Sequence, residues 1–320
     1  IEFVENEKKV KKEKVKTNKR KKGRWLKVLG TILLTIILIL AILIGLAYMY
    51  ITNKLSKMNT VQLDESQLGI TAEASTKLAK YRNIAIFGVD SREDDYGKGN
   101  RSDCMIIASI NNEIKEVRLI SVYRDTYVNI QGHGLDKITH AYSYGEAPLA
   151  INTLNTNLDL NISEFVTVNF DSVSDAVDEL GGVTINIENE EIKYINDYID
   201  ATAQITHKTA KHVTSAGRQT LDGVQAVAYS RIRYTAGGDY KRTERMRNVI
   251  EAMANKLKSK NIMEINNFMD EILPKVYTNI SQKTVMSMIP DMMNYKVSTS
   301  IGWPYEVKGI TLDRWYGVPV

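Results

Sequence analysis

The sequence contains one cysteine, Cys104, and four histidines in 320 residues. A single cysteine cannot form an intramolecular disulfide, so a domain of this size must rely on its hydrophobic core for stability. This favours a Gram-positive-type cell surface over a disulfide-rich secretory route. Cys104 follows Asp103 at the start of an apolar run, and we expect it to be a small buried hydrophobic residue.

Several catalytic signatures are absent as well. The chain has no Gly-x-Ser-x-Gly elbow, no glycine-rich phosphate loop and no His-Glu-x-x-His motif. His207 and His212 are five residues apart, which is a poor spacing for a metal pair on a helix. His133 lies in a glycine-flanked turn, and His140 is expected to be structural. These absences argue against catalysis by a histidine-activated nucleophile.

Charged residues are missing from Val28–Ile51, a run of 24 residues. As a helix this run reaches about 36 Å, enough to cross a hydrocarbon core of about 30 Å. The alternative is a cleaved signal peptide, whose apolar region is only about 7–15 residues long and ends at a small-residue cleavage site. The sequence therefore predicts an uncleaved, single-pass transmembrane helix over residues 28–51.

The residues before this helix form a basic tail. Residues 1–27 carry twelve Lys or Arg and four acidic residues, whereas the rest of the chain is mildly acidic. A positive flank stays in the cytoplasm, so the tail is predicted to be cytoplasmic and everything after Tyr50 to lie outside the cell. The tail lacks interleaved aromatic residues and any DNA-reading module, so no nucleic-acid partner is expected.

The remainder has the pattern of a layered α/β domain. Residues 52–80 are polar and are predicted to form an extracellular stalk, followed by one catalytic domain over residues 81–320. Short β-branched runs predict strands at 83–89, 105–110, 118–122, 165–170 and 183–187. Helices are expected at 147–158, 171–180, 223–229, 239–257 and 284–293, with Asp171 or Ser172 as an N-cap and Gly181-Gly182 as a stop. The alternation predicts an α/β/α fold, and the polar segment 192–214 is expected to be a flexible excursion.

Carboxylates and arginines follow the predicted strands at their ends. Asp90 follows the first strand, and Arg101-Ser-Asp103 precedes the second. Asp90 and Asp103 can share one Mg²⁺, because magnesium needs only one or two protein carboxylates when substrate phosphates complete its coordination. Arg124 and Asp125 close the third strand in the same way. The structural alternatives are solvated surface charges and an Arg124–Asp125 pair that pins a turn.

A second group of arginines surrounds a glycine-rich turn. Arg231 and Arg233 end one predicted helix, and Asp239 and Arg242 begin the next. Guanidinium groups bind phosphate through paired N–H donors, and an arginine in the first turn of a helix opposes the helix dipole unless an anion is present. An exposed basic helix face, which includes Arg245, is the competing explanation.

Taken together, these segments resemble the LytR-CpsA-Psr family of cell-wall polymer ligases from about Asn83 to Lys256. The matching motifs, in order, are Gly88-Val-Asp-Ser-Arg92, Arg101-Ser-Asp103, Ser121-Val-Tyr-Arg-Asp-Thr126, Lys137-Ile-Thr-His-Ala-Tyr-Ser-Tyr-Gly145, Val177-Asp-Glu-Leu-Gly-Gly-Val183, Ala216-Gly-Arg-Gln-Thr-Leu-Asp-Gly-Val-Gln-Ala226, Tyr229-Ser-Arg-Ile-Arg233 and Gly238-Asp-Tyr-Lys-Arg242. Eight matches in the same order are a far more specific signal than any one motif.

The resemblance implies an α/β/α domain with a deep pocket for a polyprenyl pyrophosphate. It also implies transfer of a lipid-linked glycopolymer, such as teichoic acid or capsular polysaccharide, onto a muramic-acid hydroxyl of peptidoglycan. By position, Asp90 and Asp103 would ligate Mg²⁺ (or Mn²⁺), and Asp239 would orient the arginines. The residues implied to hold the pyrophosphate are Arg101, Arg124, Arg231, Arg233 and Arg242. Asp90, Asp103 and Arg124 are the expected catalytic residues. Either Asp90 accepts the proton of the attacking hydroxyl, or Asp90 only binds the metal.

One position departs from the family pattern. The family commonly has Arg-Gln in this helix, whereas here Arg245 precedes Met246, which weakens the case for Arg245 as a ligand. Two other functions stay open at this point. One is hydrolysis of the pyrophosphate by water, and the other is a non-enzymatic membrane regulator or precursor-binding protein.

Overall fold

The computed structural model describes residues 30, 32–91 and 96–320. The chain divides into two units, Ile1–Asn53 and Lys54–Val320. The predicted basic tail over residues 1–27 lies outside the described residues, as do the first residues of the predicted membrane span and Arg92.

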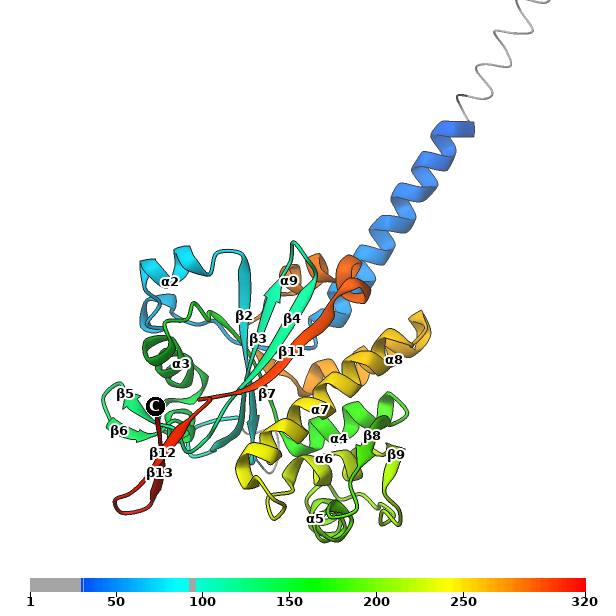
Figure 1. Ribbon diagram of the computed structural model, residues 1–320. Helices are drawn as coiled ribbons and strands as arrows, with labels where there is room; N and C mark the ends of the chain where they lie inside the picture. The colour runs from blue at the N-terminus through cyan, green and yellow to red at the C-terminus, as the bar shows by residue number, and fades with distance from the viewer. Residues whose placement is uncertain (1–29, 31, 92–95) are drawn as a thin grey trace, which may run out of the picture. The chain divides into compact units, whose positions relative to one another are not determined.

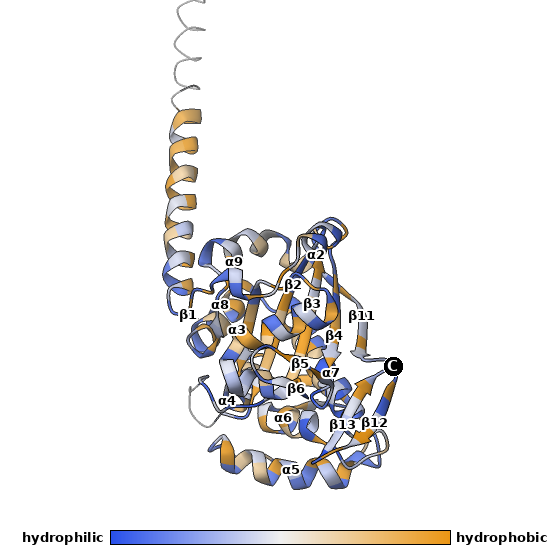
Figure 2. Cartoon of the chain, turned by 90° about the vertical axis from the view of Figure 1, so that its left-hand side faces the viewer, coloured by the Kyte–Doolittle hydropathy of each residue, from blue (hydrophilic) through white to orange (hydrophobic). Residues whose placement is uncertain are grey.

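An apolar helix spans Ile32–Leu55 and is long and apolar enough to cross a membrane. Its large side chains are exposed to an unusual degree, 68% for Leu34 and 69% for Ile44. Figure 2 shows orange, hydrophobic residues along most of its length. Over its apolar part the helix exposes hydrophobic side chains on all sides, which suits lipid surroundings. The predicted span 28–51 overlaps most of it.

A seven-stranded mixed sheet forms the centre of the unit Lys54–Val320 (Figure 1). Its strands are β1 (Asn59–Thr60), β2 (Tyr81–Val89), β3 (Ser102–Asn111), β4 (Glu116–Val122), β7 (Glu164–Val168), β10 (Tyr277–Thr278) and β11 (Lys296–Trp303). They are arranged in the order β1-β10-β7-β2-β3-β4-β11. β2, β3 and β4 are antiparallel neighbours, whereas β7 runs parallel to β2 and β11 runs parallel to β4.

Three two-stranded sheets accompany the main one. They are β5 (Tyr127–Ile130) with β6 (Gly134–Lys137), β8 (Val183–Ile187) with β9 (Gly217–Leu221), and β12 (Val307–Thr311) with β13 (Trp315–Pro319). The strand predicted at 183–187 therefore has the expected bounds, but it pairs with β9 in a sheet of its own.

Helices cover both faces of the main sheet. The described helices of this unit are α2 (Ala72–Lys77), α3 (Thr139–Leu158), α4 (Phe170–Glu179), α5 (Glu191–Ile205), α6 (Gly223–Arg231), α7 (Gly238–Lys258), α8 (Ile262–Ile272) and α9 (Gln282–Met288), with 3₁₀ turns at Glu65–Gln67, Leu273–Lys275 and Ile289–Asn294. Ile107 packs in the core that contains Leu154 of α3, whereas its neighbour Ile106 packs in the core that contains Ile250 of α7. Since successive strand residues point to opposite faces, the predicted α/β/α layering is confirmed.

A separate core lies beneath α4, α5 and α6. Val177, Ile199 and Val224 pack there with Ile185 of β8. The prediction of a flexible excursion over 192–214 is wrong, because α5 occupies most of it and buries Ile195, Ile199 and Thr202. Two isoleucines four residues apart give a narrow apolar stripe that is hard to recognise in the sequence.

Residues 54–80 do not form a polar stalk. Leu55 and Leu68 are fully buried, and Leu63 and Ile70 pack against the main core. β1 pairs with β10 at the edge of the main sheet. The compact unit therefore begins at Lys54 rather than at residue 81.

Other element boundaries also shift. The strand predicted to reach Phe170 ends at Val168, because Asn169 caps α4 through reciprocal hydrogen bonds with Ser172. The predicted N-cap at Asp171 or Ser172 is therefore wrong, although Gly181-Gly182 ends the helix as expected, with φ values of +73° and +85°. α3 begins at Thr139 and is interrupted at Gly145 and Glu146. The helix predicted at 284–293 is α9 followed by a 3₁₀ turn.

Candidate functional site

Three of the predicted motifs meet at one edge of the main sheet. Val89 at the end of β2 lies opposite Ser102 at the start of β3, and β4 ends at the same edge because it is antiparallel to β3. Gly88 makes this approach close, since a Cβ atom there would lie 2.8 Å from the Cβ of Cys104. Antiparallel pairing thus brings Asp90, Asp103 and Arg124 together.

These residues line one cavity of about 820 Å³. Of the eight residues singled out in the sequence, seven line it: Asp90, Arg101, Asp103, Arg124, Arg231, Arg233 and Arg242. They come from β3, α6 and α7 and from the loops after β2, β4 and α6. These seven side chains therefore border the same space.

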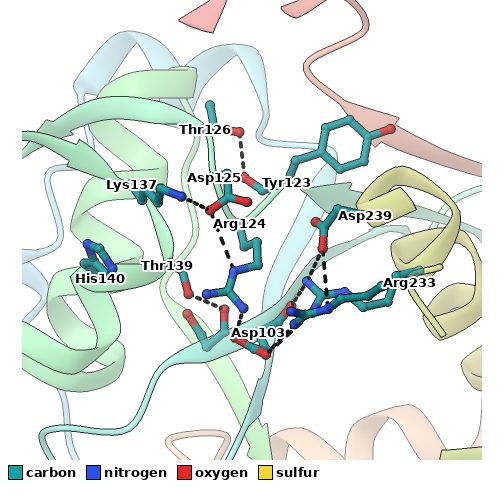
Figure 3. Close-up of polar contacts among 12 residues, drawn as sticks. Asp103, Tyr123, Arg124, Asp125, Thr126, Lys137, Thr139, His140, Arg233 and Asp239 are labelled. Carbon is teal, nitrogen blue, oxygen red and sulfur yellow. Dashed lines mark hydrogen bonds and ion pairs between the residues drawn. The ribbon is translucent and has the colours of Figure 1, made fainter. Parts of the chain in front are cut away.

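Asp103 is the centre of the charged network (Figure 3). Its Oδ1 accepts a hydrogen bond from Arg124 Nη1 at 2.5 Å, and its Oδ2 accepts one from Arg233 Nη2 at 3.0 Å. Arg242 Nη2 donates to the backbone carbonyl of Asp103 at 3.2 Å. Asp103 thus gathers three guanidinium groups, which come from the loop after β4, the loop after α6, and α7.

Asp239, the eighth predicted residue, lies behind the arginines rather than in the cavity wall. Its Oδ1 is 2.8 Å from Arg242 Nη2 and 4.0 Å from Arg233 Nε. Burial raises the pKa of the Asp239 carboxyl above its ordinary value, although Arg242 and Arg233 act in the opposite direction. Asp239 therefore contacts both arginines from outside the cavity wall.

The network carries more positive charge than its carboxylates neutralise. Arg242 is 1% exposed, and burial lowers the pKa of its guanidinium group. Within the described residues, the buried Nε atoms of Arg124 and Arg242 have no hydrogen-bond partner. These Nε atoms have almost no accessible surface, so the positive charge that a ligand meets comes from the five arginines that line the cavity, against two aspartates, Asp90 and Asp103. The charged end therefore suits a polyanionic group.

Arg231 is held by different contacts. Its guanidinium lies 4.7 Å from the ring centroid of Phe170 and 5.4 Å from that of Tyr198, and its Nη1 donates to Thr202 Oγ1 at 2.9 Å. Tyr198 and Thr202 belong to α5, the helix that the sequence did not predict. Burial lowers the pKa of the Arg231 guanidinium group. The contacts with Phe170, Tyr198 and Thr202 hold that group in place.

The other part of the cavity is apolar. It is lined from four helices, α4, α6, α7 and α8, by side chains that include Val173, Ala176, Val227, Met246, Met253 and Phe268. The sequence gave no means of naming these residues, because their helices meet only in the folded domain. Met246, the departure from the family pattern, contributes to this apolar wall. A hydrocarbon chain matches such a lining.

Arg245 does not face the cavity. Its Nε donates to Glu191 Oε1 at 2.6 Å, and its other nitrogens donate to the carbonyl of Ile232 at 3.1 Å and to Thr235 Oγ1 at 2.6 Å. Both Arg245 and Glu191 are buried. The doubt about Arg245 as a ligand was justified, because its donors hold the segment that carries Arg233.

Polar residues also line the rim beyond Arg124. Lys137 Nζ is 2.6 Å from Asp125 Oδ1, and Asp136 accepts from the ring of His140 at 2.8 Å. His140 is buried and paired with Asp136, and it does not line the main cavity. In the described part of the chain, no three His, Cys, Asp or Glu side chains cluster as a metal site. The acidic side chains at the main cavity are Asp90, which is exposed, and Asp103.

Comparison with known proteins identifies a family that matches most of this chain. The LytR_cpsA_psr family matches residues 45–314 of the chain. A polyisoprenyl-teichoic acid–peptidoglycan teichoic acid transferase, TagT of Bacillus subtilis (strain 168), is 31% identical over 301 residues, which cover 91% of this chain and 90% of the relative.

Solved structures agree with that match. A structure of TagT bound to LIIa-WTA has a TM-score of 0.60 at 25% identity, covering 81% of this chain and 87% of the other. The LytR-CPS2A-psr family protein YwtF (TagT) with bound octaprenyl pyrophosphate lipid has a TM-score of 0.54 at 25% identity, covering 81% of this chain and 86% of the other.

Proposed function

The chain belongs to the LytR_cpsA_psr family, and we propose that it transfers a polyprenyl-pyrophosphate-linked glycopolymer onto the muramic-acid hydroxyl of peptidoglycan, releasing polyprenyl phosphate. The observation that carries the proposal is the division of the 820 Å³ cavity into an arginine-rich end and an apolar end. A polyprenyl pyrophosphate has a matching anionic diphosphate and a matching apolar tail, joined end to end. The named activity of the 31% identical relative supports the same reaction.

In this proposal the arginines bind and stabilise the diphosphate. The main task in phosphoryl transfer is to neutralise charge on the phosphoryl oxygens and the leaving group. Arg124 and Arg242 line the charged end, and Arg101, Arg231 and Arg233 add positive charge to the same wall. The preorganised guanidinium groups hold the phosphorus nearest the glycan in line with the attacking hydroxyl.

The carboxylates have two proposed roles. Asp90 and Asp103 both line the cavity, and their oxygens are the ligand type that Mg²⁺ or Mn²⁺ prefers. The Asp103 carboxylate already accepts hydrogen bonds from Arg124, Arg233 and Arg242, whereas Asp90 is exposed and accepts none from the residues that the structure describes. Together they would hold a divalent cation that, when bound, neutralises phosphoryl charge. Asp90 is also the group placed to accept the proton of the attacking hydroxyl.

The apolar end accommodates the polyprenyl tail. Side chains such as Val173, Ala176 and Phe268 exclude water from that end and fix the direction in which the lipid enters. The charged end then meets the diphosphate, and the glycan extends beyond it. The lipid is drawn from the membrane in which the helix Ile32–Leu55 is anchored.

The membrane orientation is part of the same proposal. The basic tail over residues 1–27 stays in the cytoplasm, and the domain Lys54–Val320 faces the cell wall. Peptidoglycan and the lipid-linked polymer are then both accessible to the arginine-lined cavity.

The experiment incubates the full chain in detergent with a lipid-linked glycopolymer and peptidoglycan, and measures polymer that becomes covalently attached. Arg124→Ala and Asp103→Ala are each expected to lower attachment by about 10²-fold or more. Arg218→Ala is the matched control, because Arg218 is exposed on β9 and does not line the cavity. Release of polymer into solution without attachment would indicate a hydrolase, and full attachment by both variants would indicate a binding protein.

A further inference from the structure

A second, smaller cavity of about 200 Å³ lies beside the charged end of the first. It is lined by the segment after β4, by the start of α7, and by the C-terminal hairpin β12–β13. The hairpin reaches this position because Gly317 donates its N–H to the carbonyl of Asp125 at 2.9 Å. Side chains from three distant parts of the chain therefore close one space.

The two cavities share residues along one boundary. Arg124 lines the first cavity, whereas its neighbours Tyr123 and Asp125 line the second. Asp239 lines the second cavity and binds Arg242 of the first at 2.8 Å. Figure 3 shows Tyr123, Asp125 and Asp239 on the side of Arg124 that faces away from Asp103. A ligand that extends past the arginines reaches this second space.

Aromatic side chains form much of its wall. Trp315 is 45% exposed and Tyr240 is 39% exposed, and the rings of Tyr240 and Tyr123 meet edge to face with centroids 4.5 Å apart. The indole of Trp315 lies against Gly309, where a Cβ atom would be only 2.7 Å from its Nε1. Glycine on the neighbouring strand therefore lets the indole lie close against the hairpin backbone.

The wall of this cavity is acidic, although Oδ1 of each carboxylate binds a cation behind the wall, Lys137 for Asp125 and Arg242 for Asp239. Its acidic residues are Asp125 and Asp239, and among the described residues no lysine or arginine lines it. An ionised carboxylate only accepts hydrogen bonds, so the cavity favours a ligand rich in hydroxyl donors and disfavours a phosphate. Aromatic rings pack well against the C–H faces of such a ligand. A volume below that of common ligand pockets, about 300–1,000 Å³, suits a single ring.

We propose that this second cavity is a subsite for one sugar ring of a glycan, held between the Trp315 indole and the carboxylates of Asp125 and Asp239. The inference rests on the proposed transferase function, because it gives the glycan its place beside the diphosphate. Two glycans have this chemistry. One is the polymer on the lipid donor, and the other is the sugar chain of the peptidoglycan acceptor.

The kinetic test compares the full-length wild type, Trp315→Ala and Tyr305→Ala in detergent. Tyr305 is a suitable control, because it is 77% exposed on the same C-terminal segment and lines neither cavity. Trp315→Ala is expected to raise one KM by roughly three- to tenfold. A higher KM for soluble peptidoglycan fragments identifies the acceptor glycan. A higher KM for the lipid-linked glycopolymer, but not for polyprenyl pyrophosphate without sugar, identifies the donor glycan.

A second variant separates a binding effect from loss of the hairpin. Tyr240→Ala changes the same cavity from α7 and leaves β12–β13 intact, and it is expected to raise the same KM as Trp315→Ala. If both variants have the KM values of the wild type and of Tyr305→Ala for both substrates, the subsite does not exist.

A binding measurement distinguishes this failure from failure of the transferase. Saturation-transfer NMR with the N-acetylglucosamine–N-acetylmuramic acid disaccharide and with the free repeat unit of the polymer needs no turnover. Binding of either sugar that is lost in Trp315→Ala and kept in Tyr305→Ala supports the subsite even if no transfer occurs. Transfer by the wild type with unchanged kinetics and sugar binding in Trp315→Ala and Tyr240→Ala rejects the subsite and leaves the proposed function standing.

Discussion

Glu191 at the start of α5 and Arg245 in the middle of α7 form a buried ion pair, with 2.6 Å between Oε1 and Nε. The side chains are only 4% and 3% exposed. Arg245 also binds the carbonyl of Ile232 and the hydroxyl of Thr235, which flank Arg233. This pair therefore connects two helices with the segment that brings Arg233 to the cavity.

Breaking this pair is expected to destabilise the domain. Glu191→Ala leaves the buried Arg245 charge without its partner, and such a loss costs about 3–5 kcal/mol. Urea denaturation followed by circular dichroism measures the change in the free energy of unfolding. Glu190→Ala is the matched control, because Glu190 is exposed and makes no capping hydrogen bond through its side chain. Equal stabilities of the two variants would contradict this assignment.

The transfer rate is expected to depend on the protonation of Asp239. Burial raises the pKa of this carboxyl above 3.8, so it gains a proton at a higher pH than an ordinary aspartate. As the pH falls through that raised pKa, neutral Asp239 loses its attraction for Arg242 and Arg233, and kcat falls. The kcat of Asp239→Asn should be low and should lack this inflection. An unaltered inflection in Asp239→Asn would assign the titration to another group.

Cys104 is expected to react slowly in the folded protein. Burial raises the pKa of its thiol from 9.0 to about 12, and only the thiolate is nucleophilic. At pH 8 the folded protein should therefore react with iodoacetamide about 10³-fold more slowly than the protein in urea. Because Cys104 is the only cysteine, mass spectrometry reports its alkylation directly. Cys104 is partly buried and lines the main cavity, so similar rates in the two states would show that the cavity wall does not shield the thiol.

Filling the apolar end should discriminate between long and short lipids. Val173 lines that end from α4, so Val173→Trp is expected to raise the KM for a long polyprenyl pyrophosphate roughly tenfold or more. A short-chain analogue should be affected less, because its tail does not reach the added ring. Ile114→Trp serves as the control, since Ile114 is 57% exposed in the turn after β3. Equal effects on both lipids would mean that the tail lies elsewhere.

Metal dependence follows from the proposed roles of Asp90 and Asp103. Removal of divalent cations with EDTA is expected to lower the transfer rate, and added Mg²⁺ or Mn²⁺ is expected to restore it. Asp90→Asn should raise the metal concentration needed for half-maximal activity, because it removes a charged oxygen ligand. Full activity in EDTA would reject the metal role and leave charge neutralisation to the arginines.

Local patterns in the sequence determined the central strands, the apolar helix and several of the charged residues at the cavity. Short runs rich in β-branched residues predicted β2, β3 and β4, and an unbroken apolar run predicted the helix that includes most of Ile32–Leu55. The Asp90, Asp103 and Arg124 motifs could be found because each lies within a few residues of a strand end. Antiparallel pairing then required those ends to meet.

Tertiary structure decided the features that depend on distant contacts. α5 is held by two buried isoleucines and by Arg245, which lies 54 residues after Glu191. The apolar wall around Met246 and the position of Trp315 beside Asp125 are likewise visible only in the folded chain. Short-range patterns record the local preferences of the backbone, whereas burial and charge pairing depend on which segments the fold brings together.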